Sequence, residues 1–217
     1  MSRKALVMWG GWDGHTPKDA AEIIACELRK NGFDVRLENS LAALDDAEYV
    51  KTLNLIVPVW TMGQISDPQL KNMLDAIKSG VGFGGFHGGA GDAFRGRLDY
   101  EWMVGGLFAG HPHVGEYTVK VKRKSNPIMK GMAAEFPYVS EQYYMLTDPM
   151  NKVLATSTYK YDGNECEMPV VWTKTLGNGR VFYSALGHVA EEFRKYPEVL
   201  AMTIRGMIWA SKSKKVS

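Results

Sequence analysis

The sequence predicts one α/β domain over residues 1–217, with an open, mostly parallel sheet, helices on both faces and additional strands in the C-terminal half. Three observations predict this class. Apolar runs alternate with amphipathic helical patterns in the first half of the chain. After residue 110 the pattern changes to strand-like runs separated by turns. The length of 217 residues fits a single such domain.

The first strand is expected at residues 5–10 (ALVMWG), an apolar run that ends in glycines and suits a buried parallel strand. A helix is then expected to begin at Thr16 and Pro17, because a capping side chain followed by proline is typical of a helix start. Asn31 and Gly32 mark the end of this helix.

Two further strands are expected at residues 33–37 and at residues 53–60 (LNLIVPVW). The second run is apolar throughout, which is typical of a central strand. Pro58 cannot donate a hydrogen bond within the sheet, so the C-terminal end of this run is expected to leave the sheet.

Ser66 and Gln69 form a capping-box pair, which predicts a helix that ends at Gly80. A strand at residues 81–86 follows and leads directly into His87. Strand and helix therefore alternate in the order that produces a parallel sheet with right-handed crossovers.

The C-terminal half is expected to add strands and one closing helix. The Gly177-Asn178 pair between two strand-like runs predicts a tight hairpin, and residues 197–210 predict the last helix. The expected strands are residues 116–122, 139–145, 153–159, 168–175 and 180–186.

Composition and charge exclude several classes of partner. The net charge is +2 and 23% of residues are charged, so no broad field favours nucleic acid or a membrane surface. The start of the chain lacks a signal-peptide pattern and no apolar run reaches membrane-spanning length, so we expect a cytoplasmic protein. Cys26, in a helix, and Cys166, in a loop, form no disulfide framework, which indicates a reducing compartment.

Two histidines follow predicted strands. His87 lies in a G-x-H-x-G pattern, where a tight turn would lift its ring into the crevice for acid or base chemistry or for metal binding. The alternative is a histidine that only hydrogen-bonds the turn. His188 follows Gly187 at the end of a later strand and lies on the same edge if the strands are parallel; it also has a structural alternative.

Glu141 lies within a strand-like run beside aromatic residues, where a carboxylate is costly to bury without a purpose. Alternation places Glu141 and Tyr143 on one face and Gln142 and Tyr144 on the other, so only one pair can line a site. The alternative is an edge strand with a solvated glutamate.

Aromatic and polar side chains at strand ends suit a sugar, because its C–H faces stack on rings and its hydroxyls need hydrogen bonds. Trp12 and Trp60 would serve this role, although either could instead pack the sheet edge. No glycine loop suited to a nucleotide is present, so no cofactor is evident. The candidate substrate-binding residues are Trp12, Asp13, His15, Trp60, Asp92, Arg95, His111, Gln142, Tyr143 and Tyr144.

A set of motifs spread over nearly the whole chain resembles the ThuA-like (trehalose utilisation) family, including its rhizobial members. The motifs are GGWDGH, IVPVWTMG, GFHGGAGDAFR, DYEWMVGG, SEQYYM and PVVWTKTLGNGRVFYSALGH. The resemblance implies a flavodoxin-like fold similar to that of class I glutamine amidotransferases. Those enzymes need a cysteine where this chain has His87, and a His-x-Glu pair where His188 precedes Val189 and Ala190, so glutamine hydrolysis is not expected.

The resemblance also implies catabolism of trehalose or a related disaccharide, beside a separate NAD-dependent dehydrogenase that makes or uses 3-keto sugars. Our hypothesis is that His87, His188 and Glu141 form an acid–base cluster that isomerises, epimerises or eliminates from a keto sugar. If a divalent metal takes part, these three side chains are its expected ligands.

Two other functions remain open. The chain could be a noncatalytic sugar-binding or accessory subunit of the dehydrogenase. Hydrolysis of a glycosidic bond would need a second carboxylate, from Asp13 or Asp92, beside Glu141. The region of Trp102 and Phe108 suits a homo-oligomer contact.

Overall fold

The computed structural model describes residues 2–212, whose strands form one nine-stranded sheet. Along the sheet the strands lie in the order 2-1-3-4-9-8-7-5-6, numbered by their place in the chain. The strands are β1 (Arg3–Gly11), β2 (Phe33–Glu38), β3 (Leu55–Thr61), β4 (Gly82–Phe86), β5 (Gly106–Val121), β6 (Glu135–Thr147), β7 (Lys152–Tyr161), β8 (Asn164–Leu176) and β9 (Gly179–Ser184).

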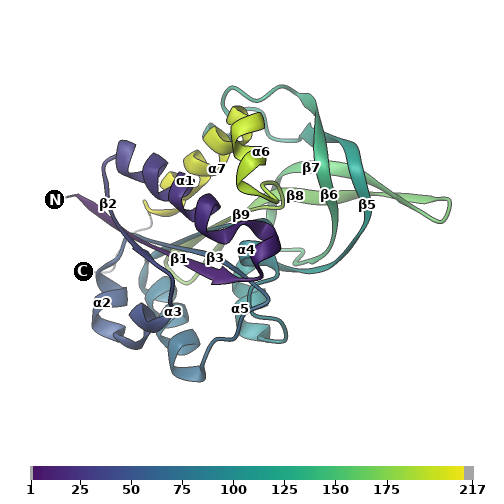
Figure 1. Ribbon diagram of the computed structural model, residues 1–217. Helices are drawn as coiled ribbons and strands as arrows, with labels where there is room; N and C mark the ends of the chain where they lie inside the picture. The colour runs from purple at the N-terminus through teal and green to yellow at the C-terminus, as the bar shows by residue number, and fades with distance from the viewer. Residues whose placement is uncertain (1, 213–217) are drawn as a thin grey trace.

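Helices cover both faces of the parallel strands, as the sequence predicts. Figure 1 shows α1, α6 and α7 on one face and α2, α3 and α5 on the other. The helices are α1 (Pro17–Lys30), α2 (Ala47–Thr52), α3 (Asp67–Ser79), α4 (His87–Gly91), α5 (Leu98–Val104), α6 (Ala190–Lys195) and α7 (Pro197–Ala210), with short 3₁₀ turns η1 (Asp13–His15), η2 (Ala42–Asp45) and η3 (Pro127–Met129).

The sheet has a parallel and an antiparallel half. Strands β2, β1, β3, β4 and β9 are parallel and have the order 2-1-3-4-5 of doubly wound flavodoxin-like sheets. From β9 to β6 every pairing is antiparallel. The predicted α/β class and its additional C-terminal strands are confirmed. The sheet is not mostly parallel as predicted, since parallel and antiparallel strand pairings are equally numerous.

Strand β3 corrects one expectation. It stays paired with β1 as far as the Gly11–Thr61 pair, so its C-terminal end does not leave the sheet. It pairs with β4 only at Leu55 and Ile56. Beyond Ile56, β3 has no ladder partner on the β4 side, and a residue without an N–H is tolerated in such a place.

The start of α1 also differs from expectation. Thr16 occupies the N-cap position, but its hydroxyl makes no capping bond and its backbone is left-handed, with φ of 44°. The hydroxyl instead accepts a hydrogen bond from the backbone N–H of Ala190, at 2.9 Å. This contact ties the start of α1 to the start of α6. The predicted capping box of Ser66 and Gln69 is present at α3.

Strands β5 and β6 are longer than the sequence pattern suggested. β5 begins at Gly106, ten residues before the expected start, and includes the Gly110–His113 stretch, which was not assigned to a strand. Register shifts between Phe108 and His113 interrupt its pairing with β6. The hydrophobic alternation fails at these bulges, which is why the pattern missed this part of the strand.

Two further expectations concern the compartment. Among residues 2–212, no helix is long and apolar enough to cross a membrane. Cys26 and Cys166 are free and exposed. Cys26 lies in α1 as expected, whereas Cys166 lies in β8 rather than in a loop.

Candidate active site

His87 lies at a tight turn between β4 and α4. Its φ of 41° is in the left-handed region, which costs energy for a residue with a side chain and is typical of functional sites. The tight turn is therefore present, but the ring is only 1% exposed. The imidazole lies beneath the crevice rather than projecting into it.

His188 lies on the same edge of the sheet, because β9 runs parallel to β4 with Phe86 opposite Ser184. A buried carboxylate holds the loop that carries it. Glu192 Oε2 accepts a hydrogen bond from the backbone N–H of His188 at 2.9 Å and one from the hydroxyl of Tyr138 at 2.5 Å.

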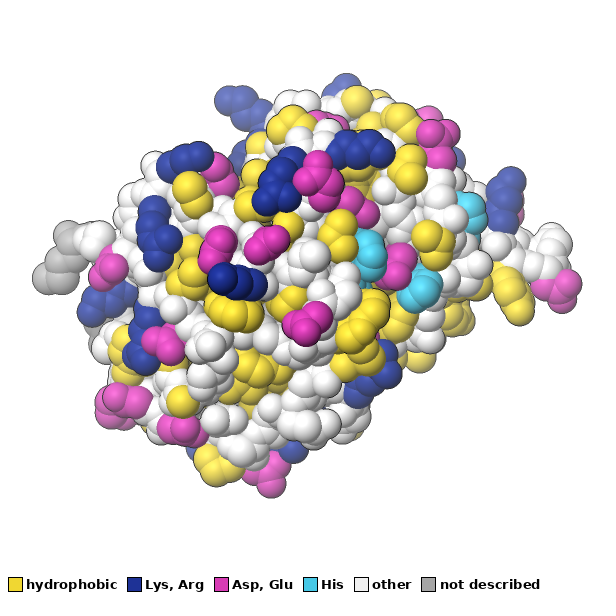
Figure 2. Space-filling view, in the orientation of Figure 1, with side chains coloured by type: hydrophobic (Ala, Val, Ile, Leu, Met, Phe, Trp, Pro, Cys, Tyr) yellow, Lys and Arg dark blue, Asp and Glu magenta, His cyan; other side chains and the backbone are white. Residues whose placement is uncertain are grey.

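His15, expected only as a substrate-binding residue, joins these two histidines from the loop after β1. The ring centroids are 4.9 Å apart for His15 and His87, 4.9 Å for His15 and His188, and 5.0 Å for His87 and His188. The three rings thus form a nearly equilateral triangle. Figure 2 shows histidine side chains gathered around an acidic one on this face.

Glu141 of β6 completes the cluster. Its Oε2 lies 3.6 Å from His87 Nε2 and 3.4 Å from His188 Nδ1, and its Oε1 lies 3.5 Å from His111 Nε2. β6 is indeed an edge strand, but the Glu141 side chain is only 11% exposed and is not a solvated glutamate. The three side chains expected to carry the chemistry therefore meet in one place.

Hydrogen bonds orient two of the rings. His15 Nδ1 lies 2.7 Å from Thr61 Oγ1, and His87 Nδ1 lies 2.8 Å from the hydroxyl of Tyr143. Both bonds use the Nδ1 atom and leave Nε2 free for other contacts. In the described residues, His87 Nε2 and His188 Nδ1 are buried and have no hydrogen-bond partner.

Burial keeps the inner rings uncharged. Burial, reinforced by the nearby histidines, lowers the pKa of His87 well below its ordinary value. Burial and the neighbouring His188 and His111 lower the pKa of His15 to about 4. Burial raises the pKa of Tyr143 well above its usual range. At neutral pH, His15 and His87 are therefore neutral and Tyr143 keeps its proton.

A cavity of about 140 Å³ opens above the cluster and gives a ligand access to it. His87 and His188 are not among the residues that line it, whereas His15 and Glu141 are. The lining residues are Trp12, His15, Thr61, Met62, Asp92, Arg95, Phe108, His111, Glu141 and Tyr143.

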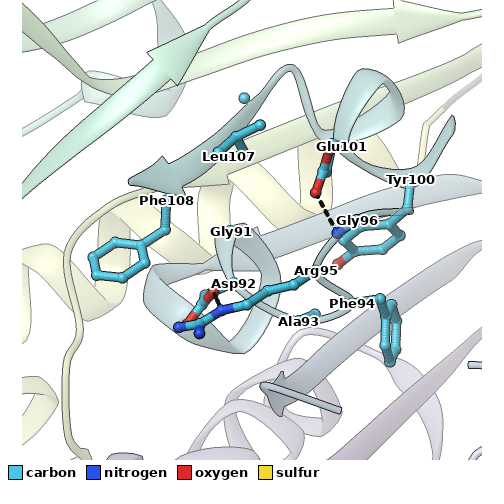
Figure 3. Close-up of a pocket in the computed structure, with 11 residues that line it drawn as sticks. Gly91, Asp92, Ala93, Phe94, Arg95, Gly96, Tyr100, Glu101, Leu107 and Phe108 are labelled. Carbon is cyan, nitrogen blue, oxygen red and sulfur yellow. Dashed lines mark hydrogen bonds and ion pairs between the residues drawn. The ribbon is translucent and has the colours of Figure 1, made fainter. Parts of the chain in front are cut away.

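A second cavity of about 210 Å³ adjoins the first and shares Asp92, Arg95 and Phe108 with it. Figure 3 shows the Arg95 side chain reaching back to Asp92. Arg95 Nε and Nη2 donate to the two oxygens of that carboxylate, at 2.5 and 2.8 Å. Asp92 thus reaches the same cavity as Glu141, but its charge is paired.

Four expected substrate-binding residues lie elsewhere. Asp13 is exposed and does not line the cavity. Trp60 packs against Gly10 and Gly63, the structural alternative considered for it. Gln142 hydrogen-bonds Ser157 and Thr158 on the other face of β6, and Tyr144 stacks on Tyr159 there. Alternation along the strand had predicted that only one of the two pairs faces the site.

Some cavity residues were not identified from the sequence. Phe108 was expected at a homo-oligomer contact, but it packs against Tyr143 and His111, with ring centroids 4.4 and 5.7 Å away. The position of Thr61 at the end of β3 was the signal that could have identified it as a partner of His15. Trp102 remains half exposed, beside the ammonium group of Lys174.

Comparison with known proteins gives a family and a fold. The model of the ThuA family, described as trehalose utilisation, matches residues 4–210. No curated protein matches the sequence. A ThuA-like protein from Bacteroides uniformis has a similar structure, with a TM-score of 0.78, 20% identity, and 98% of this chain and 93% of that chain covered.

Two other solved structures extend the likeness in fold. A ThuA-like protein from Parabacteroides merdae has a TM-score of 0.76 and 17% identity, with 100% of this chain and 92% of that chain covered. A cytoplasmic protein from Salmonella typhimurium has a TM-score of 0.63 and 14% identity, with 97% and 100% covered. At these identities the structures show a common fold.

Proposed function

The chain belongs to the ThuA family of trehalose utilisation, and from this premise we propose that it is an enzyme acting on the 3-keto derivative of trehalose or a related disaccharide. The reaction proceeds by proton transfer beside the keto group. The supporting observation is the meeting of His87, His188 and Glu141 at the carboxyl edge of the parallel strands, below a cavity lined by aromatic and polar side chains.

The chemistry follows from the position of the carbonyl. A keto group at carbon 3 acidifies the C–H bond at carbon 2 and places the glycosidic oxygen on carbon 1, one bond further. In elimination, the C2–H bond breaks, its electrons form a C1=C2 double bond, and the C1–O bond breaks. The leaving oxygen takes a proton. Isomerisation and epimerisation begin with the same proton removal and return a proton to the sugar.

The residues have distinct roles in this scheme. Glu141 is the member of the expected trio that lines the cavity, so it accepts the carbon-bound proton. Its Oε2 faces His87 Nε2 and His188 Nδ1, at 3.6 and 3.4 Å. Tyr143, which keeps its proton, and His111 are the nearby groups that can donate to a substrate oxygen. Trp12 is 48% exposed at the rim and offers a ring face for a sugar.

The sequence contains no nucleotide loop, so the redox step belongs to a separate NAD-dependent dehydrogenase in this proposal. We also propose a cytoplasmic location. A structural neighbour is named as a cytoplasmic protein, and the two cysteines of this chain are free, as expected in a reducing compartment. The order of the parallel strands supports the proposed likeness to class I glutamine amidotransferases.

The test is proton exchange in deuterated water. Incubated with a 3-keto disaccharide such as 3-keto-trehalose, the wild-type protein should replace the C2 proton with deuterium, or release a product, faster than buffer alone, as followed by NMR. Glu141→Gln should lower this rate by roughly 10²- to 10⁴-fold, and His87→Ala should also reduce it. His113→Ala, at an exposed histidine outside the cluster, is the matched control.

The outcomes separate the candidate functions. A wild-type protein that neither exchanges nor converts the sugar contradicts the proposed reaction. If it nevertheless binds the sugar, with affinity unchanged in Glu141→Gln and His87→Ala, the noncatalytic accessory role is favoured. Circular dichroism spectra of the variants should match that of the wild type, so that lost activity is not confused with unfolding.

A further inference from the structure

We propose that His15, His87, His188 and Glu141 bind one divalent transition-metal ion of the zinc type. The inference rests on the proposed function for the metal's role in the reaction, while the site itself is argued from side-chain geometry. One ligand atom from each of the four side chains lies within 4.8 Å of all the others. These residues come from four separate segments: the 3₁₀ turn after β1, the first residue of α4, the loop after β9 and the edge strand β6.

The distances around Glu141 are close to those of a metal site. In a tetrahedral site with bonds of about 2.1 Å, neighbouring ligand atoms lie about 3.4 Å apart. Glu141 Oε2 lies 3.4 Å from His188 Nδ1 and 3.6 Å from His87 Nε2. At these separations no hydrogen bond forms to either nitrogen atom.

The unpaired nitrogen atoms are the second observation. A buried polar atom without a partner costs roughly 1–3 kcal/mol. His87 Nε2 and His188 Nδ1 are both in this condition in the described part of the chain, and both face Glu141. A metal ion between these two nitrogen atoms and Glu141 Oε2 would give each nitrogen a partner.

The outer contacts have the pattern seen around metal-bound histidines, whose second ring nitrogen usually donates a hydrogen bond. His15 Nδ1 can donate to Thr61 Oγ1 and His87 Nδ1 to the hydroxyl of Tyr143. A proton on Nδ1 leaves Nε2 as a lone pair. His111, 3.5 Å from Glu141 Oε1, orients the carboxylate from the other side.

The donor set selects the class of ion. Three imidazoles and one carboxylate suit zinc and its first-row neighbours, whereas calcium and magnesium prefer oxygen ligands. The cavity reaches His15 and Glu141, so a substrate oxygen has a path to the centre. When bound, such an ion supplies Lewis-acid polarisation of a carbonyl oxygen. His87 and His188 would then be ligands rather than proton carriers. Glu141 would bind the ion through Oε2 and keep Oε1, the oxygen on the side of His111, to accept the carbon-bound proton.

The test measures metal binding directly. Tag-free protein is stripped with a chelator and titrated with zinc by calorimetry, and with cobalt(II) by visible absorption. We expect one ion per chain and a cobalt spectrum of low coordination number. His188→Ala and the isosteric Glu141→Gln should each weaken zinc binding by at least about 100-fold, more than outer-contact mutations typically do. His113→Ala should bind as the wild type does.

No stoichiometric binding by the wild type, or equal binding by all of these variants, would overturn the inference. Thermal unfolding of each stripped variant shows whether it is folded, and Glu141→Gln serves if His188→Ala is not. Full exchange activity in the stripped protein would remove the metal from the reaction and leave the proposed function intact. Zinc binding without exchange would retain the metal site and contradict the proposed function.

Discussion

Glu192 illustrates how a single residue positions the site from outside it. It receives hydrogen bonds from the backbone of His188 and from Tyr138, and it does not line the cavity. Glu192→Ala removes both bonds and leaves the partly buried N–H of His188 unpaired. The free energy of unfolding should fall by about 1–3 kcal/mol. The exchange rate at saturating sugar should fall while KM changes little, because His188 loses its position but the cavity is kept.

Urea unfolding and exchange kinetics measure these two effects. The matched control is Glu191→Ala, one residue earlier on the exposed side of α6, where the carboxylate pairs with Arg194 at the surface. That variant should stay within about 0.5 kcal/mol of the wild type. Equal effects of the two substitutions would show that Glu192 has no special positioning role.

At this scale the sequence identified much of the site. Strand ends predicted His87 and His188, and the cost of a carboxylate in an apolar strand predicted Glu141. His15 was expected only to touch substrate, because its local sequence has no feature that aims its ring at the other two. Trp60 could not be assigned, since packing a sheet edge and stacking on a sugar require the same residue type.

At the scale of elements, the backbone of α4 at Gly88 lies close to the His15 side chain. A Cβ atom on Gly88 would lie 2.4 Å from His15 Cε1 and 3.0 Å from the Tyr143 hydroxyl. Gly88→Ala should therefore displace His15 and reduce both the exchange rate and zinc affinity by roughly tenfold or more, a loss typical of small displacements in an active site.

Gly110→Ala is the matched control, because its added Cβ would meet no atom within 4 Å. Calorimetry with zinc and the exchange assay should show the control unchanged. Wild-type zinc affinity in Gly88→Ala would mean that His15 tolerates the displacement and does not contribute to the centre.

Among the elements, apolar runs and capping signals predicted the parallel strands and the longer helices well. The short helices α4, α5 and α6 left no comparable periodic pattern. The first part of β5 was missed because glycine, proline and bulges interrupt its alternation. That part of β5 carries Phe108 and His111, which line the cavity, so this side of the cavity was not predicted either.

At the scale of the whole molecule, burial of the histidines links stability to pH. The folded-state pKa of His15 is about 4 and that of His87 is also lowered, whereas both take up a proton near pH 6.5 in the unfolded chain. Below pH 6.5 the unfolded state therefore binds more protons, and stability falls as the pH decreases toward 4.

Chelator-treated protein should accordingly show a lower Tm at pH 5 than at pH 7.5 in calorimetry. The decrease should be smaller in His15→Asn, which cannot titrate at that position, and unchanged in His113→Ala. A Tm that does not vary over this pH range would contradict the burial of neutral rings.

The assembly of the site also belongs to this scale, and sequence patterns could not predict it. Glu141 reaches the histidines because β6 pairs with β5 in one register, with Val114 opposite Glu141, at the far edge of the sheet. A shift of one residue would turn Glu141 to the other face. Local sequence patterns predict each strand, but the register between strands depends on how the whole domain packs.

The most direct measurement of the central claim, that four side chains from separate segments form one centre, is a crystal structure of the zinc-loaded protein with anomalous maps across the zinc edge. We expect a single strong peak bonded to His15, His87, His188 and Glu141 at about 2.0–2.2 Å. A peak bound elsewhere, or no peak with these four side chains apart, would contradict the account.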